Sequence, residues 1–145
     1  MHTIENTIQI AATPSRILEA LTTKEGMQGW WTTDVECNEA KREATFRFAR
    51  KTSEAMAVTF QLLSADEQGV VMKCIRDTNN PDWMGTTLAF KLATIAGGKT
   101  RVDLSHAGYP AKNELYDQCV KGWAFFLGSL QKYVETGTGE PFENP

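Results

Sequence analysis

The sequence predicts an α+β fold in which a curved antiparallel sheet is closed by one long C-terminal helix. Between residues 33 and 106, apolar and polar residues alternate in six successive segments, a pattern typical of half-buried strands. Near the C-terminus the apolar spacing changes to four, three, four, three and four residues, which places one stripe along a helix. The stripe consists of Tyr116, Val120, Trp123, Leu127, Leu130 and Val134.

The N-terminal segment predicts one strand followed by two short helical pieces. A strand is expected near residues 3–10, where isoleucines alternate with polar residues. Thr13 and Pro14 mark a helix start, because threonine is a favoured N-cap and proline suits the first helical position. We expect this helix to end at residues 24–26, and a second short helical turn to cover residues 27–31.

Six further strands follow, joined mostly by short turns. They are predicted at 33–38, 43–50 and 55–64, and around Val70–Cys74, Leu88–Leu92 and Val102–His106. A loop is expected over residues 77–85, and Gly97 and Gly98 supply the positive φ angles that a tight hairpin needs. The order is therefore β-α-α-β-β-β-β-β-β-α, which predicts an antiparallel meander covered by a final helix of about 23 residues beginning after Ala111.

Size and composition narrow the class of protein. A chain of 145 residues is expected to form one domain, and its net charge of −3 argues against general nucleic-acid binding. No apolar run approaches the ~20 residues of a membrane span, and the N-terminus lacks signal-peptide features. The three cysteines form no CxxC pair, which predicts reduced thiols, a cytoplasmic location, and core packing for Cys74 and Cys119.

Several separate places along the chain match one family. They are Thr13-Pro14 with Ile17, Ala20 and Leu21; Trp30-Trp31; the strand end at 102–109; Gly122-Trp123; and Leu130 with Gly137-Thr138-Gly139. On these features the chain resembles the helix-grip fold of the START and birch-pollen-allergen (SRPBCC) superfamily. More narrowly, it resembles the domain named for the C-terminal part of the activator of the heat-shock protein 90 ATPase.

The resemblance covers nearly the whole chain and implies a scaffold rather than one activity. Relatives use it for ligand binding, co-chaperone work, lipid transfer or cyclase chemistry. We expect no separate N-terminal domain of the activator's kind, because the single unit accounts for the whole length.

A sheet curved around a helix predicts a hollow between them, and we hypothesise that a small apolar or amphipathic ligand binds there. The candidate cavity residues are Trp31, Phe48, Val58, Phe60, Met72, Cys74, Arg76, Phe90, Leu104, His106, Trp123 and Leu127. Arg76 and His106 are expected to supply the polar contacts. The same aromatic residues also fit a solid core, in which Trp123 is a plug rather than a pocket wall.

The two polar candidates have structural alternatives. Arg76 continues an inward alternation, and because an inward charge is costly unless paired, it either pairs with Asp34 or Glu36, anchors an anionic headgroup, or lies at a frayed strand end. His106 is either a hydrogen-bonded residue at the cavity rim, a ligand-orienting group or a general acid–base. It cannot pair with Ser105, because neighbouring side chains in a strand point to opposite faces.

Other chemistry is not expected. His2 and His106 are too far apart to form a local metal-ligand motif, so no metal site is predicted, and we expect no cofactor. Arg47 lies between Phe46 and Phe48, which imitates a basic–aromatic patch for nucleic acids. In a strand, however, the phenylalanines face the core while the cation faces water.

The face of the final helix opposite its apolar stripe carries Phe125, with Asp117, Lys121 and Lys132 around it. A single exposed aromatic residue needs no explanation, but a homodimer contact is an alternative. Gly122 costs about 1 kcal/mol relative to alanine inside a helix, so it either permits close approach of the sheet or leaves room for a ligand.

Three functions follow from these observations. The first is a non-catalytic domain that binds a small apolar or amphipathic ligand. The alternative is a stress-response or co-chaperone-type interaction module with a chaperone or other protein partner. A cyclase-like enzyme ranks third, because no nucleophile, metal cluster or acid–base pair supports catalysis.

Overall fold

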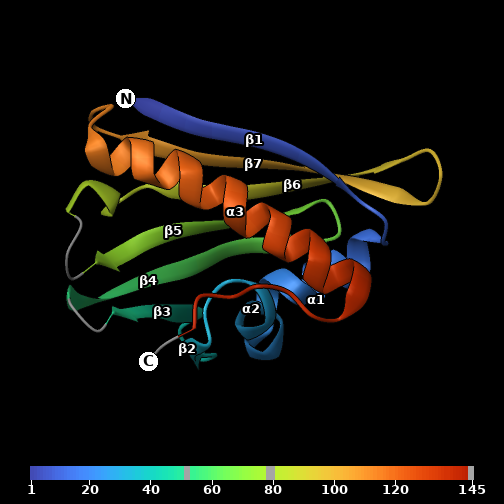
Figure 1. Ribbon diagram of the computed structural model, residues 1–145, viewed down its shortest axis with the longest axis horizontal. Coiled ribbons are helices and arrows are strands. Elements are labelled where there is room, and N and C mark those ends of the chain that lie inside the picture. The colour runs from blue at the N-terminus through green and yellow to red at the C-terminus, as the bar shows by residue number, and fades with distance from the viewer. Residues whose placement is uncertain (51–52, 78–80, 144–145) are drawn as a thin grey trace.

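The computed structural model describes residues 1–50, 53–77 and 81–143, so residues 78–80 of the predicted loop lie outside it. The elements follow the predicted order (Figure 1). They are β1 (His2–Ile10), α1 (Pro14–Thr22), α2 (Lys24–Trp30), β2 (Asp34–Asn38), β3 (Glu43–Arg50), β4 (Ser53–Asp66), β5 (Gly69–Asp77), the 3-10 helix η1 (Pro81–Trp83), β6 (Thr87–Ile95), β7 (Lys99–Tyr109) and α3 (Glu114–Thr136). The helix η1 occupies part of the segment that was predicted as a loop.

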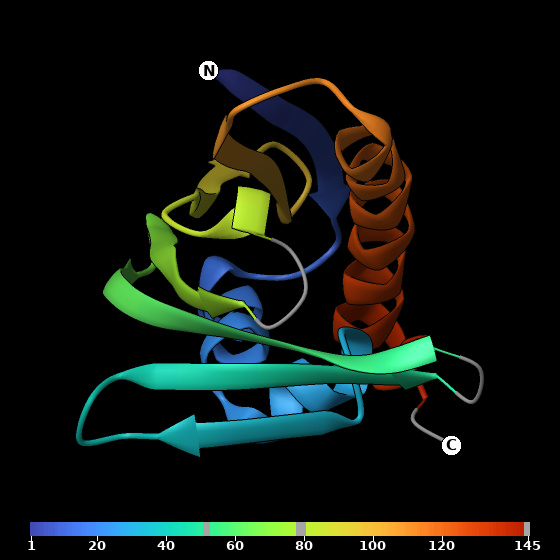
Figure 2. The same ribbon diagram turned by 90° about the vertical axis from the view of Figure 1, so that its left-hand side faces the viewer.

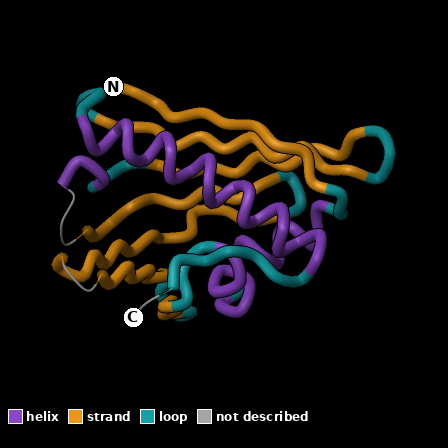
Figure 3. Tube along the Cα trace, viewed as in Figure 1, coloured by secondary structure: helices purple, strands orange, loops and turns teal. Residues whose placement is uncertain are grey.

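The described strands form one seven-stranded antiparallel sheet in the order β1-β7-β6-β5-β4-β3-β2. The sheet curves, and α3 crosses its concave side (Figures 2 and 3). The helices α1 and α2 lie near one end of α3, where α2 contacts both α3 and β2. The predicted helix-grip arrangement is therefore confirmed.

Thr23 joins the first two helices. Its hydroxyl accepts a hydrogen bond from the Gly26 backbone N–H at 3.0 Å and donates one to the Glu19 carbonyl at 2.8 Å. It is thus the C-cap of α1 and the N-cap of α2. The prediction that residues 24–26 end the first helix is wrong, because this double cap makes them the first turn of the second.

The helix α3 has the predicted length, with 23 residues, and begins at Glu114, three residues after Ala111. Asn113 caps its N-terminus by accepting from the Tyr116 N–H at 3.1 Å, and Gly137, at φ 89°, caps its C-terminus in the left-handed conformation. Most of the predicted stripe faces the core, but Val120 is 41% exposed and Cys119 is buried beside it. Val120 therefore lies at the margin of the packed face rather than in it.

Candidate functional site

All of the predicted site residues except Arg76 are buried. Ten of them belong to one hydrophobic cluster, namely Trp31, Phe48, Val58, Phe60, Met72, Cys74, Phe90, Leu104, Trp123 and Leu127, and the eleventh, His106, is a buried polar residue. They come from α3, the α2–β2 connection and the inner faces of the strands between β3 and β7. The sequence pattern therefore identified positions that the fold brings together.

The aromatic members of this cluster pack against one another. The Trp31 ring centroid lies 4.0 Å from that of Phe46 and 5.4 Å from that of Trp123. Trp30 stacks on Trp31 at 5.0 Å, and Phe90 meets Trp123 edge-on at 6.2 Å. These separations are close to the roughly 4.5–7 Å range of packed aromatic pairs. Trp123 was expected to be either a packed core residue or part of a pocket wall, and this packing favours the core residue.

His106 lies at the centre of a buried hydrogen-bond network. The Trp123 indole N–H, which can only donate, donates to His106 Nδ1 over 3.1 Å. The ring proton is therefore on Nε2, which donates to Thr86 Oγ1 over 2.9 Å. The Thr86 hydroxyl donates to the Trp83 carbonyl oxygen over 2.6 Å, and the Tyr109 hydroxyl lies 2.9 Å from Nδ1. The network connects β7, α3 and the segment before β6.

The same burial determines the charge of His106. The side chain has no exposed surface, and desolvation lowers its pKa to about 3. The imidazole is therefore neutral at physiological pH, and both ring nitrogens are engaged within the protein. Of the roles considered for His106, the hydrogen-bonded structural one fits best, although the residue lies in the core rather than at a rim.

The cysteine thiols are not activated. Cys74 and Cys119 are buried as predicted, and desolvation raises the pKa of both, that of Cys74 to about 12. Cys37 is exposed, but partial desolvation also raises its pKa. Because the thiolate is the nucleophilic form, these shifts disfavour cysteine chemistry at neutral pH.

Arg76 does not face the core. A register shift pairs Phe60 with Cys74 but Thr59 with Arg76, so β5 advances two residues where β4 advances one. This bulge moves Arg76 to the outer face of the sheet. There it forms a 2.6 Å ion pair with Glu43, whose side chain is only 8% exposed while that of Arg76 is 64% exposed.

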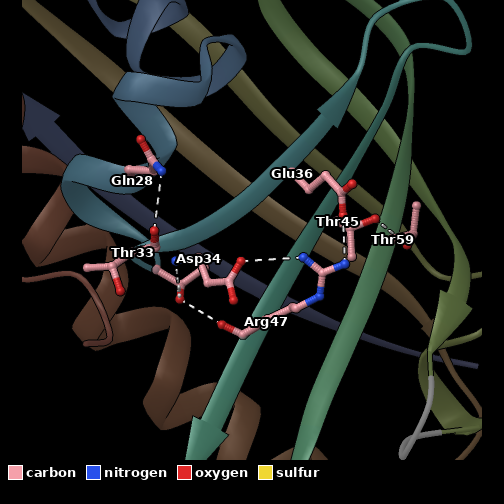
Figure 4. Close-up of polar contacts among 8 residues, drawn as sticks. Gln28, Thr33, Asp34, Glu36, Thr45, Arg47 and Thr59 are labelled. Carbon is pink, nitrogen blue, oxygen red and sulfur yellow. Dashed lines mark hydrogen bonds and ion pairs between the residues drawn. The ribbon is translucent and has the colours of Figure 1, made fainter. Parts of the chain in front are cut away.

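The acids predicted as partners of Arg76 pair with another arginine. Arg47 contacts Glu36 at 2.7 Å and Asp34 at 3.4 Å on the outer face of β2 and β3 (Figure 4). The Arg47 hydrogen bond is the main cause of a lowered pKa at Glu36. Beside this group the hydroxyls of Thr45 and Thr59 lie 2.8 Å apart. The cation between Phe46 and Phe48 thus belongs to an outer polar surface, as the alternation predicted.

A pocket of about 220 Å³ lies between the helices α1 and α2 and the strands β2–β5. Its lining residues are Leu21, Thr22, Met27, Cys37, Asn38, Glu39, Arg42, Glu43, Ala44, Phe60, Leu62 and Met72. Only Phe60 and Met72 belong to the predicted cavity set. The aliphatic, thioether and aromatic groups form an apolar wall, and the polar residues come from β2, β3, the turn between them and, with Thr22, the end of α1.

A wider polar depression of about 910 Å³ adjoins this pocket. The two share Thr22, Cys37, Asn38, Glu39 and Glu43, and the depression continues to the outer-face residues Glu36 and Arg76. The cations around both are Lys24, Lys41, Arg42 and Arg76, and the acids are Glu25, Glu36, Glu39 and Glu43. Their formal charges cancel.

Sequence reasoning missed most of these pocket residues because three distant segments form the wall. Leu21 and Met27 read as helix core positions, and Ala44 and Leu62 as strand positions. One feature that marks this pocket in the chain is a backbone conformation, which the residue types alone do not reveal. Arg42 has φ 56°, a left-handed conformation that is uncommon outside glycine, and its carbonyl accepts from the Leu62 N–H at 2.8 Å.

Within residues 1–50, 53–77 and 81–143, no cluster of three or more histidine, cysteine, aspartate or glutamate side chains is arranged to hold a metal ion. In that same part of the chain, no helix has both the length and the apolar character needed to cross a membrane.

Comparison with solved structures places the fold among known proteins. The solution structure described as the Aha1 dimer from Colwellia psychrerythraea is 30% identical, with a TM-score of 0.79, covering 96% of this chain and 100% of that chain. Protein CV1439 from Chromobacterium violaceum shares the fold at 17% identity and a TM-score of 0.77, covering 93% of this chain and 99% of that one. Protein MLL2253 from Mesorhizobium loti does so at 16% identity and a TM-score of 0.73, covering 90% and 95%.

No curated protein matches the sequence. The family model described as "Activator of Hsp90 ATPase homolog 1-like protein" matches residues 11–135, which is most of the chain. The predicted family resemblance is therefore confirmed, and the chain belongs to the activator of Hsp90 ATPase homolog 1-like family.

Proposed function

We propose that this protein binds a small amphipathic molecule at the pocket between α1–α2 and β2–β5. The observation that carries the proposal is the adjacency of an apolar wall to a polar depression. Met27, Phe60 and Met72 supply flexible and aromatic contacts for an apolar group, as ligand pockets commonly do. The polar part of the ligand then lies toward Glu39, Arg42 and the depression beyond them.

The dimensions and charges of the site define the ligand class further. A volume of about 220 Å³ is below the roughly 300–1,000 Å³ of typical ligand pockets, so the apolar part is a short chain or a single small ring. The cations and acids around the opening balance, which favours a neutral or zwitterionic polar group over a strongly charged one. The raised pKa of Cys37 favours binding over covalent chemistry at this site.

Filling the pocket tests this function. Ala44 lines the pocket from β3, and Ala44→Leu adds volume there without removing a core side chain. Ala89→Leu on β6 is the matched control, because Ala89 is likewise partly buried in a strand but does not line the pocket. Short-chain alcohols, amides and zwitterionic amphiphiles should perturb backbone NMR signals around Met27 and Phe60 in the wild type and the control.

In Ala44→Leu these perturbations should be lost. If no compound of these classes shifts the Met27 and Phe60 signals at millimolar concentration, the ligand-binding proposal fails. If binding persists unchanged in Ala44→Leu, the ligand occupies another site and the pocket assignment fails.

A protein-interaction function is the second candidate, and the family description favours it. In this reading the domain acts as a co-chaperone-type module whose partner is an Hsp90 chaperone. The ATPase rate of a purified Hsp90 should then rise on addition of the chain. An unchanged rate with saturating protein contradicts this candidate.

Self-association is the third property that we propose. The relative from Colwellia psychrerythraea is described as a dimer and matches this chain along nearly its full length. We propose that the chain likewise forms a homodimer. Sedimentation velocity over a concentration series measures this directly.

A further inference from the structure

The outward face of α3 carries apolar residues that its own chain does not cover. Phe125 is 53% exposed and Val120 is 41% exposed, and the exposed residues Ala124 and Gly128 lie between them on the helix surface. Figure 2 shows α3 with the sheet on one side and its other side facing outward. Phe125 is held in place by an edge contact with Phe126, at 5.4 Å between ring centroids.

The glycines of this helix are not explained by packing within the chain. A Cβ atom added at Gly122 or Gly128 would meet no described heavy atom within 4 Å. Close approach of the sheet, one of the reasons considered for Gly122, is therefore wrong. Glycine is unfavourable in a helix interior, so contacts within the chain do not account for its use here. Gly128 and Ala124 give this face small residues beside the exposed Phe125 ring, and small residues let a second helix approach closely.

The charges on the same face change sign along α3. Asp117 lies in the N-terminal half of α3 and Lys132 in the C-terminal half, and both are exposed. Lys132 also pairs with Glu140 of its own chain at 3.1 Å. Two copies of α3 packed antiparallel place acid against lysine at both ends of the contact. A parallel pair instead places Asp117 against Asp117 and Lys121 against Lys121.

We propose that this face of α3 is the homodimer interface, formed by antiparallel packing against α3 of a second copy. This inference rests on the proposed self-association and locates it. The two-fold axis passes between Ala124 and Phe125, as an isologous contact requires. In this register Phe125 packs on Ala124 of the partner subunit, Lys121 lies over Gly128 of the partner subunit, and Asp117 pairs with Lys132 of the partner subunit.

The first test measures the dissociation constant by sedimentation velocity. Phe125→Glu should raise it at least about tenfold, because a central buried aromatic residue dominates such contacts. Leu63→Glu is the matched control, since Leu63 is 49% exposed but lies on β4, and it should change the constant less than about twofold. Circular dichroism of both variants checks that they remain folded.

The second test asks whether the two α3 helices pack antiparallel or parallel. Asp117→Lys should weaken the dimer, and adding Lys132→Glu to it should restore most of the affinity. In a parallel pair the second change brings no such rescue. In a Cys37→Ser background, Ala124→Cys should form an intermolecular disulfide on mild oxidation, whereas Leu63→Cys should not.

The outcomes separate the two proposals. A wild-type chain that stays monomeric at several hundred micromolar contradicts both self-association and this interface. A wild-type dimer that is insensitive to Phe125→Glu and yields no disulfide through Ala124→Cys leaves self-association standing and overturns the α3 interface. A dimer weakened by Phe125→Glu but without rescue by the charge exchange overturns the antiparallel register.

Discussion

The indole nitrogen of Trp123 on α3 donates a 3.1 Å hydrogen bond to Nδ1 of His106 on β7, and the two side chains are 3% and 0% exposed. The bond joins the long helix to β7, the strand next to the β1 edge of the sheet, within an aromatic core. It also leaves the Nε2 proton of His106 for Thr86. One buried imidazole therefore links α3, β7 and the segment that precedes β6.

Removing this imidazole should be strongly destabilising. His106→Leu places an apolar side chain in the core, leaves the Trp123 N–H without its acceptor and removes the hydrogen bond that the Thr86 hydroxyl accepts from Nε2. We expect a loss of about 2–5 kcal/mol in the free energy of unfolding. Urea unfolding followed by tryptophan fluorescence measures it, and Leu63→Ala at the surface should stay within about 0.5 kcal/mol of wild type. A His106→Leu protein as stable as wild type contradicts the assigned role.

Stability should also depend on pH through His106. Its folded-state pKa is about 3, below the ordinary value of 6.5, so below pH 6.5 the unfolded chain binds a proton that the folded chain does not. The free energy of unfolding should therefore fall by up to about 1.4 kcal/mol per pH unit as the pH drops from 6.5 toward 3.

The informative window is pH 5–6.5, above the range in which most carboxylates titrate. In that window the His106→Gln variant should lose this part of the slope, because glutamine takes up no proton. Equal slopes in the two proteins show that another group is responsible.

Thr23 should contribute more to the stability of the fold than an ordinary surface threonine does. Thr23→Ala removes the side-chain cap of α2 and the hydroxyl bond to the end of α1 at once. We expect a loss of about 1–2 kcal/mol, at the upper end of single-cap effects. Thermal unfolding measures it, and Thr23→Ser, which keeps the hydroxyl, should recover most of the stability. If Thr23→Ala and Thr23→Ser are equally stable, the double-cap role of the Thr23 hydroxyl is contradicted.

The two arginines of the outer face, Arg76 and Arg47, should differ in how much each contributes to the free energy of unfolding. Arg76→Met leaves the carboxylate of Glu43, 8% exposed, without its cation, and we expect a loss of about 1–2 kcal/mol. Arg47→Met breaks pairs with Asp34 and Glu36, which are 45% and 67% exposed, and should cost about 0–1 kcal/mol. Denaturant unfolding of both variants gives the comparison, and a larger loss for Arg47→Met reverses the predicted order.

The sequence by itself determined the features that depend on residues close together in the chain. The spacing of Trp123, Leu127 and Leu130 set the buried face of α3, and the apolar pattern also gave its length of about 23 residues. Alternation set the inner faces of the strands, so that nearly every predicted cavity residue is buried. These signals are local because strands repeat every two residues and helices about every 3.6.

Only the tertiary structure decided how those buried faces meet. A bulge opposite Phe60 moved Arg76 to the outer face, and no pattern within β5 alone reveals a register shift made with β4. Trp123 became part of a packed aromatic core because Trp31 and Phe90 reach it from distant segments. The pocket lies under α1–α2 for the same reason, since Met27, Ala44 and Phe60 become neighbours only when helix and sheet close on each other.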